Sequence, residues 1–269
     1  MAVTVETYAT AEEAGRALRT GGDARYLGGG TIVMRAINYG DQSFRRVVRA
    51  TDPALRQVRA QGARVEIGSG VTMAEVIDSR ELAFLAPVAR WIGGPAVREV
   101  ATVGGNLFAE HPYGDFAAAL LALDAVVTEV GGATRPLEAL LSARTRGTQP
   151  LITAVSVMRP EAGAFRFAKV SRVKPKGVSV MSIAAWLPQQ GGRISGARIA
   201  YGAMAATPIR TMGVERALEG KTLDAAGIAP ALSAATDGLQ PPSDALASGW
   251  YRREVAPVHL RRLLLGEAA

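Results

Sequence analysis

Apolar and polar positions in the first 130 residues alternate between helical and extended spacing. Two capping boxes, Thr10–Glu13 and Thr72–Glu75, each precede an apolar helical pattern, and Asp115 is placed to cap a third helix over residues 116–123. Short extended segments lie between these helices, at 25–27, 46–48 and 64–67. Because strands and helices interleave without regular β-α-β spacing, the pattern favours an α+β domain over a doubly wound parallel sheet.

The remainder of the chain predicts a second, smaller α+β domain. A stretch rich in glycine and proline, residues 131–163, has weak periodicity and marks a domain boundary near residue 163. Extended segments follow, and then helical ones. The extended segments are Ala164–Val173, Val178–Leu187 and Ile194–Ala203, with a hairpin-like loop at 188–192, and the helical ones are 213–218, 225–235 and a last helix ending at Leu265. We therefore expect domains at 1–163 and 164–269, the second built from a three-stranded antiparallel sheet and helices.

Composition excludes several kinds of chemistry. The chain of 269 residues has no cysteine, so it has no disulfide, thiolate zinc site or iron–sulfur cluster of its own, and with only His111 and His259 a multi-histidine metal site is nearly excluded. No complete dinucleotide fingerprint, P-loop or nucleophile elbow occurs. The net charge of +7 permits an anionic partner without identifying one. Because no signal peptide or membrane-length apolar stretch is visible, we expect a cytoplasmic protein.

Glycine is the unusual residue, with 30 copies in the chain. Two clusters stand out: Leu27–Thr31, directly after an extended segment, and Ala101–Asn106. Consecutive glycines allow successive N–H groups to point into one concavity, which suits phosphate oxygens, and Thr31 and Thr102 add hydroxyl donors. The alternative is that each cluster is an ordinary turn.

The second glycine cluster also carries a family resemblance. It reads Ala-Thr-Val-Gly-Gly-Asn-Leu from Ala101 to Leu107 and is followed by Asp115, which is the most specific part of the resemblance. The chain resembles the FAD-binding medium subunit of molybdenum hydroxylases, the group that includes carbon monoxide dehydrogenase and xanthine dehydrogenase. Similar segments cover nearly the whole chain: Gly28–Thr31, Trp91–Arg98, Asp115–Ala125, Phe167–Arg172, Ala197–Arg210 and Ser248–Arg253.

The resemblance implies a two-part FAD-binding domain of the vanillyl-alcohol-oxidase or PCMH type, followed by a C-terminal domain of the carbon monoxide dehydrogenase flavoprotein type. It also implies non-covalent FAD, bound by a set of residues in the two glycine loops and beyond them. The set is Leu27, Gly28, Gly29, Gly30, Thr31, Ile32, Val33, Met34, Ile92, Ala101, Thr102, Gly104, Gly105, Asn106, Leu107, Asp115 and Lys169. No catalytic residue and no metal ligand is expected in this chain.

Within this set, the resemblance assigns the glycine loops to the FAD pyrophosphate and Asp115 to the ribose or ribityl hydroxyls. It places Ile92 near the isoalloxazine and Lys169 near the ring, where a cation stabilises negative charge on the reduced flavin. The alternatives are a plain helix cap for Asp115, a core residue for Ile92 and a solvated residue for Lys169. Departures from the family pattern are Gly28, Ile32 and the segment Val173–Lys176.

Two further groups of residues have less specific expectations. His111 and Tyr113 lie between the second glycine loop and Asp115, so they are candidates to border the flavin or the acceptor path. The arginines of the C-terminal segment are expected on a solvated face or a subunit interface, because aromatic residues do not interleave regularly with them as in a nucleic-acid surface. These arginines are Arg252, Arg253, Arg261 and Arg262.

The resemblance implies an electron-transfer function. A large subunit holds molybdopterin, a small subunit holds [2Fe–2S] clusters, and FAD on this chain passes electrons to NAD, a quinone, a carrier protein or oxygen, in a dimer of heterotrimers. The lack of cysteine agrees with clusters on a partner. No nucleic acid partner and no membrane span is expected. A stand-alone FAD-dependent oxidoreductase and a non-catalytic protein that binds an anionic ligand remain the alternatives.

Overall fold

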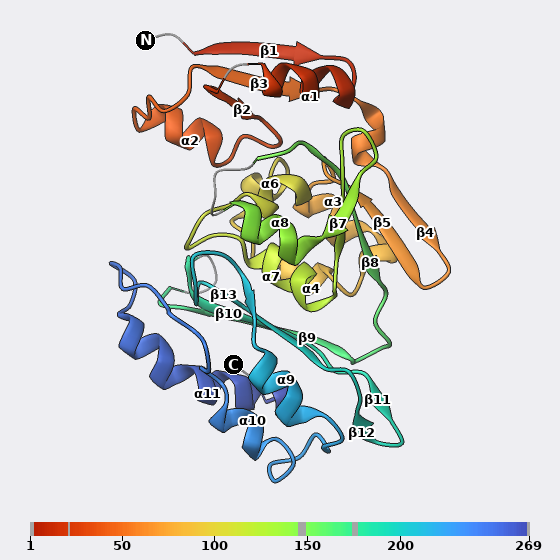
Figure 1. Ribbon diagram of the computed structural model, residues 1–269, viewed down its shortest axis with the longest axis vertical. Coiled ribbons are helices and arrows are strands. Elements are labelled where there is room, and N and C mark those ends of the chain that lie inside the picture. Colours follow the sequence, from red (N-terminus) through yellow and green to blue (C-terminus); the bar gives the residue numbers. More distant parts are fainter. Residues whose placement is uncertain (1–2, 21, 145–148, 174–176, 268–269) are drawn as a thin grey trace. The chain divides into compact units, whose positions relative to one another are not determined.

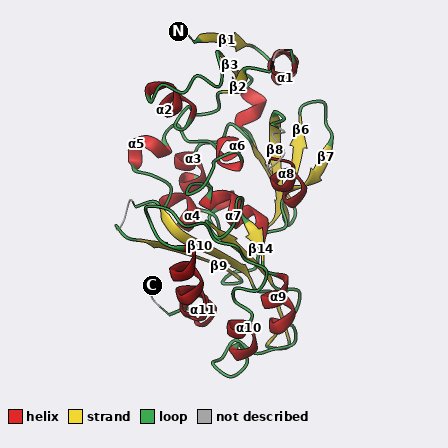
Figure 2. Cartoon of the chain, turned by 60° about the vertical axis from the view of Figure 1, so that its left-hand side comes forward, coloured by secondary structure: helices red, strands yellow, loops and turns green. Residues whose placement is uncertain are grey.

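The computed structural model describes residues 3–20, 22–144, 149–173 and 177–267 (Figure 1). The chain forms two compact units, of which the first comprises Met1–Ala109 with Val126–Val157 and the second Glu110–Ala125 with Met158–Ala269. Both units combine helices and sheets (Figure 2), so the expected α+β class is confirmed. The segment 110–125 belongs to the second unit although it lies inside the expected domain 1–163, and the division at residue 163 remains a prediction.

The N-terminal part of the first unit is a parallel sheet with the strand order β1-β3-β2. Its elements are β1 (Thr4–Tyr8), α1 (Ala11–Arg19), β2 (Ala24–Tyr26), α2 (Val33–Asn38) and β3 (Arg46–Ala50). Helix α1 lies along β1 and β3 (Figure 1) and begins at the predicted capping box, in which Thr10 and Glu13 bond each other's backbone N–H. Because all three strands are parallel, their carboxyl ends meet at one edge of the sheet.

A second, five-stranded sheet with the order β4-β5-β8-β6-β7 completes the first unit. Its strands are β4 (Val58–Gln61), β5 (Arg64–Gly68), β6 (Val126–Glu129), β7 (Thr134–Pro136) and β8 (Ile152–Met158). The helices of this part are α3 (Met73–Asp78), α4 (Ala86–Arg90), α5 (Pro95–Arg98), α6 (Val103–Leu107) and α8 (Leu137–Arg144), with the 3-10 helices η1 (Pro53–Arg56) and η2 (Arg80–Leu82). The second capping box, at Thr72 and Glu75, is also confirmed.

The second unit is built on an antiparallel sheet with the order β14-β13-β10-β9. The strands are β9 (Phe165–Ser171), β10 (Ser179–Trp186), β13 (Arg198–Gly202) and the two-residue β14 (Ile209–Arg210). The first three confirm the predicted strands, and β14 adds a short fourth. The predicted loop at 188–192 forms a hairpin between β11 (Gln189–Gln190) and β12 (Arg193–Ile194), with Gly191 and Gly192 at positive φ.

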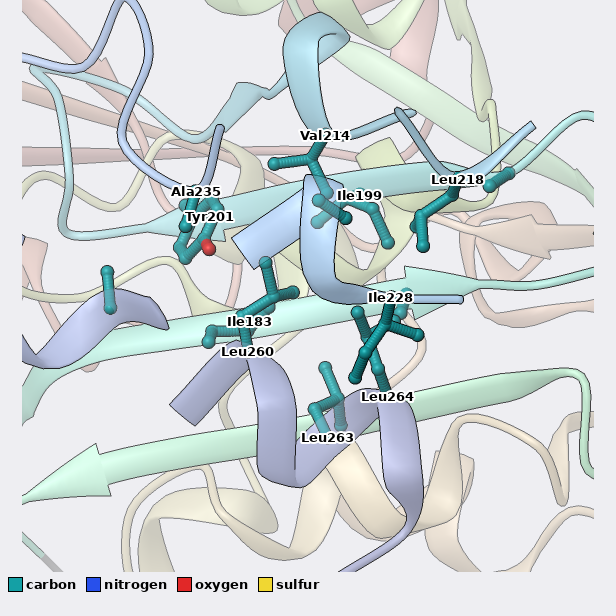
Figure 3. Packing of buried hydrophobic residues seen from close by; sticks show 14 of the residues in the cluster. Ile183, Ile199, Tyr201, Val214, Leu218, Ile228, Ala235, Leu260, Leu263 and Leu264 are labelled. Atoms are coloured by element: carbon teal, nitrogen blue, oxygen red, sulfur yellow. The ribbon is translucent and has the colours of Figure 1, made fainter. Parts of the chain in front are cut away.

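Helices cover both faces of this sheet. Helix α7 (Asp115–Ala122) packs on β10 and β13 from one side, and α9 (Met212–Leu218), α10 (Ala229–Ser233) and α11 (Gly249–Leu265) enclose the main core on the other. Ile183, Ile199 and Tyr201 point from the strands into this core, where they meet Val214 and Leu260 (Figure 3). The alternate positions of the same strands, such as Ser182 and Gly202, face α7 instead. Asp115, the first residue of α7, therefore lies on this face of the sheet.

Two expectations about local structure are corrected or lie outside the described residues. Asp115 is not a helix cap: Gly114 takes the cap position in a left-handed conformation, and Asp115 is the first residue of the helix. The segment Val173–Lys176 falls largely outside the described residues, since 174–176 are not among them. Across the described ranges, no helix combines the length and the apolar character that crossing a bilayer requires.

Candidate functional site

A pocket of about 530 Å³ lies at the carboxyl edge of the parallel sheet in the first unit. The chain leaves β2 through Tyr26–Gly30 and leaves β3 through Arg49–Asp52, and both segments line the pocket. The lining also includes Gly70, Thr72, Glu99, Val100 and Thr102. Ligands of α/β sheets bind outside the carboxyl ends of the strands, so the position alone marks this pocket as the candidate site.

The first glycine loop offers unused backbone donors to this pocket. The loop is bracketed by two hydrogen bonds, from Leu27 N–H to the Val48 carbonyl at 2.8 Å and from Met34 N–H to the Gly30 carbonyl at 2.9 Å. Between them, the N–H groups of Gly28, Gly29 and Gly30 donate to no group in the described part of the chain. Successive free N–H groups beside a pocket form the kind of cradle that binds phosphate oxygens.

The second glycine loop plays a different part, because the N–H groups of its two glycines and of Val103 are engaged within the protein. Val103 N–H donates to the Val71 carbonyl at 2.9 Å, and Gly104 N–H donates to the Ser69 carbonyl at 2.7 Å. Gly105 N–H donates to Thr102 Oγ1 at 3.0 Å, which makes Thr102 the cap of α6. The physical reason is that a helix start leaves orphan N–H groups, and the neighbouring loop and the cap satisfy them here. The Thr102 hydroxyl proton remains available at the pocket wall.

The glycines are required for the two loops to meet. A Cβ atom on Gly28 would lie 2.8 Å from Thr102 Oγ1, and one on Gly29 would lie 1.5 Å from the Val100 carbonyl oxygen. On Gly104 it would lie 2.7 Å from Ser69 Cβ. Segments more than 70 residues apart in the sequence are thereby in contact, so the structure brings together the two predicted glycine loops.

The other predicted residues of the first unit divide between the pocket and its surroundings. Leu27 and Met34 line the pocket, and Met34 and Ile32 keep 43% and 40% of their surface exposed. Ile92 is half-buried and outside the pocket lining, and the side chain of Leu107 is fully buried in the core. The remaining predicted residues of this unit sit in the loops or helices next to the pocket: Thr31, Val33, Ala101 and Asn106.

Asp115 and Lys169 form a separate polar cluster in the second unit. Lys169 Nζ lies 3.1 Å from Asp115 Oδ2, and the Ser179 hydroxyl donates to the same carboxylate, at 2.7 Å and 2.8 Å from its two oxygens. All three side chains are buried, so Lys169 is not a solvated surface residue. Ser182, the register partner of Lys169, is buried beside Gly202 with a hydroxyl that has no partner among the described residues. Sequence reasoning missed both serines, because only strand pairing brings them to Asp115.

His111 belongs to a third polar cluster, with Asp244 and Arg252. The His111 ring bonds Asp244 Oδ2, and Arg252 Nη2 lies 3.0 Å and 2.9 Å from the two oxygens of the same carboxylate. Burial acts to raise the pKa of the Asp244 carboxyl, but hydrogen bonds from the His111 ring, from backbone N–H groups and from Arg252 outweigh it. The pKa of Asp244 therefore lies well below its usual range.

The expectation that Arg252 lies on a solvated face is wrong. Its side chain is fully buried, and its guanidinium also donates to the carbonyls of Val180, at 2.9 Å, and Ala247, at 3.0 Å. An arginine is stable in the interior when carbonyl and carboxylate oxygens accept from its N–H groups, as they do here. The other arginines of that segment, Arg253, Arg261 and Arg262, are exposed as expected.

Two family models match the chain. The model described as the FAD binding domain in molybdopterin dehydrogenase matches residues 2–159, and the model described as the CO dehydrogenase flavoprotein C-terminal domain matches residues 166–266. Together they account for almost the whole sequence. The first match includes both glycine loops and every residue that lines the pocket.

Individual proteins give a consistent result. The chain is 30% identical over 266 residues to the 6-hydroxypseudooxynicotine dehydrogenase complex subunit alpha of Paenarthrobacter nicotinovorans, which covers 94% of this chain and 90% of the relative. It is 30% identical over 175 residues to the glyceraldehyde dehydrogenase medium chain of Sulfolobus acidocaldarius, covering 63% of this chain and 62% of that one. A solved structure of carbon monoxide dehydrogenase from Hydrogenophaga pseudoflava shares the fold, with a TM-score of 0.88, 24% identity, and coverage of 100% and 99% of the two chains.

Proposed function

Because the chain belongs to the family of FAD-binding medium subunits of molybdenum hydroxylases, and is thus an oxidoreductase subunit, we propose that it links the [2Fe–2S] clusters of a partner subunit to an external electron acceptor. FAD, when bound, supplies the ability to take up electrons singly and to release them singly or as a hydride. The protein supplies binding, orientation and electrostatics for that chemistry.

The observation that carries this proposal is the pocket at the carboxyl edge of the parallel sheet. Its wall includes Gly28, Gly29 and Gly30, whose N–H groups have no acceptor in the described part of the chain, and the Thr102 hydroxyl. A pyrophosphate needs several convergent donors and close backbone approach, and the first glycine loop offers both. The residues present therefore fit the diphosphate of FAD. In this proposal the first loop binds the cofactor, while the second loop supports it and contributes Thr102.

For the second unit, the proposal assigns Asp115 and Lys169 to the flavin half of the cofactor. A buried carboxylate accepts hydrogen bonds from hydroxyls, and a buried ammonium favours negative charge near it. Ile92 is proposed as an apolar contact of the same half. Each of these assignments is tested by measuring FAD affinity and flavin reduction potential in Asp115→Asn, Lys169→Met and Ile92→Ala. An unchanged affinity together with an unchanged potential in a variant contradicts its assignment.

The partners follow from what this chain lacks and from its family. With no cysteine it cannot ligate iron–sulfur clusters, so we assign the clusters to a small subunit and molybdopterin to a large one, in a dimer of heterotrimers. NAD, a quinone, a carrier protein and oxygen are the candidate acceptors. We place the assembly in the cytoplasm.

The experiment uses the complex that co-purifies with a tagged full-length chain. The wild-type complex and a complex carrying Gly29→Val are reduced with dithionite and mixed with each candidate acceptor in turn. We expect the [2Fe–2S] spectrum to bleach in both complexes, and acceptor reduction to depend on the wild-type chain. Equal acceptor reduction in a flavin-free Gly29→Val complex contradicts the electron-transfer role, and purification of an active single chain favours the stand-alone oxidoreductase.

A further inference from the structure

Arg49 is the last arginine of β3 and lies on the wall of the pocket. Its side chain makes no hydrogen bond, ion pair or ring contact with any described residue. The backbone places it next to the first glycine loop, since Leu27 N–H donates to the carbonyl of Val48, the residue before Arg49. An unpaired cation thus stands near the carboxyl end of β3, beside the end of the neighbouring strand β2, which the free N–H groups follow.

The other charged side chains of the pocket have partners or the opposite sign. Arg56 lies 2.5 Å from Glu75, which neutralises it. Asp52 accepts from Ala54 N–H at 2.9 Å and from Ala11 N–H at 3.1 Å, so its oxygens serve the local backbone. Glu99 is the remaining anion of the lining.

The free N–H groups of the glycine loop are neutral donors, whereas the two phosphates of a dinucleotide carry negative charge. A guanidinium presents a planar pair of N–H donors that matches phosphate oxygens, and such charge-assisted bonds are about twice as strong as neutral ones. Without Arg49, the anionic ligand would face Glu99 with no unpaired cation in the described lining.

We infer that Arg49 binds the diphosphate of the cofactor and is the residue through which this pocket selects the nucleoside diphosphate half of FAD. The inference rests on the proposed function, because it takes FAD as the ligand of the pocket. It assigns Arg49 a binding role that neither glycine loop can perform, namely to supply full positive charge. Phosphate-free ligands such as riboflavin and adenosine gain nothing from it.

The test compares the full-length chain, freed of flavin, with Arg49→Ala and Arg49→Gln. Arg19→Ala is the matched control: Arg19 is exposed at the end of α1, and α1 runs back along the sheet from the carboxyl edge to the opposite edge. Titration calorimetry measures the dissociation constants of FAD, ADP, adenosine and riboflavin for each protein, at low and at high salt. Circular dichroism and urea unfolding establish that each variant is folded.

We expect Arg49→Ala to weaken FAD and ADP about tenfold, the effect of losing about 1.4 kcal/mol. Adenosine and riboflavin affinities stay unchanged, Arg19→Ala binds all ligands like the wild type, and the tenfold difference shrinks at high salt. Arg49→Gln gives the same pattern and serves in its place if Arg49→Ala is unstable.

Two outcomes overturn the inference. Wild-type affinity for ADP and FAD in a folded Arg49 variant shows that the side chain is only a solvated surface arginine. An equal loss for ADP and adenosine shows that it serves the nucleoside and not the diphosphate. If the wild-type chain itself binds neither FAD nor ADP, the proposed function fails, which is a result distinct from both of these.

Discussion

The Nζ atom of Lys169 lies 3.1 Å from a carboxylate oxygen of Asp115, and both side chains are only 6% exposed. Breaking such a buried pair on one side leaves an uncompensated charge in the interior. We expect Lys169→Met to lower the free energy of unfolding by about 3–5 kcal/mol. Urea unfolding of the purified chain measures the change.

Two controls accompany that measurement. Lys221→Met removes an exposed lysine of the same unit and is expected to change stability by less than about 0.5 kcal/mol. The double variant Asp115→Leu with Lys169→Met removes both charges and is expected to recover part of the loss. Equal effects at Lys169 and Lys221 would show that the pair does not form in solution.

The two buried serines of β10 are expected to respond in opposite ways. Ser179 donates to Asp115, so Ser179→Ala leaves the carboxylate with one bond fewer and costs about 1–3 kcal/mol. Ser182 has a buried hydroxyl with no partner in the described structure, so Ser182→Ala removes an unsatisfied group and leaves stability unchanged or higher. Both variants are compared by thermal and urea unfolding. A loss at Ser182 as large as that at Ser179 contradicts the assignment of the hydrogen bonds.

The lowered pKa of Asp244 predicts that the free energy of unfolding decreases at acid pH. The pKa of Asp244 is lower in the folded chain than in the unfolded chain. Its contribution to folding stability is therefore complete above the pKa of the unfolded chain, about 3.9, and is lost progressively as the pH falls below that value. At pH 7 Asp244→Asn is expected to be less stable, because Arg252 and His111 lose their carboxylate. The difference from wild type should shrink between pH 5 and pH 3 in urea unfolding. A constant difference across that range would contradict the lowered pKa.

Gly29 tests the contact between the two glycine loops. A Cβ atom there would overlap the Val100 carbonyl oxygen, and backbone has no room to yield, so Gly29→Ala is expected to destabilise the first unit and to weaken FAD binding. Gly22 lies in open space with an ordinary φ, so Gly22→Ala is expected to be neutral or to stabilise by about 0.4–1 kcal/mol. Unfolding and FAD titration are measured on both. Equal behaviour of the two variants would contradict the loop packing.

Features set by neighbours in sequence could be predicted. Both capping boxes need only residues three positions apart, and both form in the structure. The hairpin at 188–192 likewise depends on local glycines. Strand β1 could not be predicted, because Thr4–Tyr8 is largely exposed and its partners lie some 40 residues away, in the backbone of β3 and in the Glu6–Arg46 ion pair. Strand β8 lies in a stretch of weak periodicity and is fixed by its neighbours in the sheet.

The site shows the same limit. The two glycine loops were predicted from composition and resemblance. The structure adds that the glycine N–H groups are free only in the first loop, since those of Gly104 and Gly105 donate to the Ser69 carbonyl and to Thr102 Oγ1. Asp115 looked like a helix cap because the sequence does not show Ser179 and Lys169 beside it. Arg252 looked exposed because its charge gives no sign of the carbonyls and the carboxylate that accept from it in the interior.

FAD binding by the purified full-length chain tests the central claim most directly. We predict that the chain carries the visible absorption of flavin, that one FAD is released per chain on denaturation, and that Gly29→Val loses it while Arg19→Ala retains it. A wild-type chain that is folded, colourless and unable to take up added FAD would contradict the account.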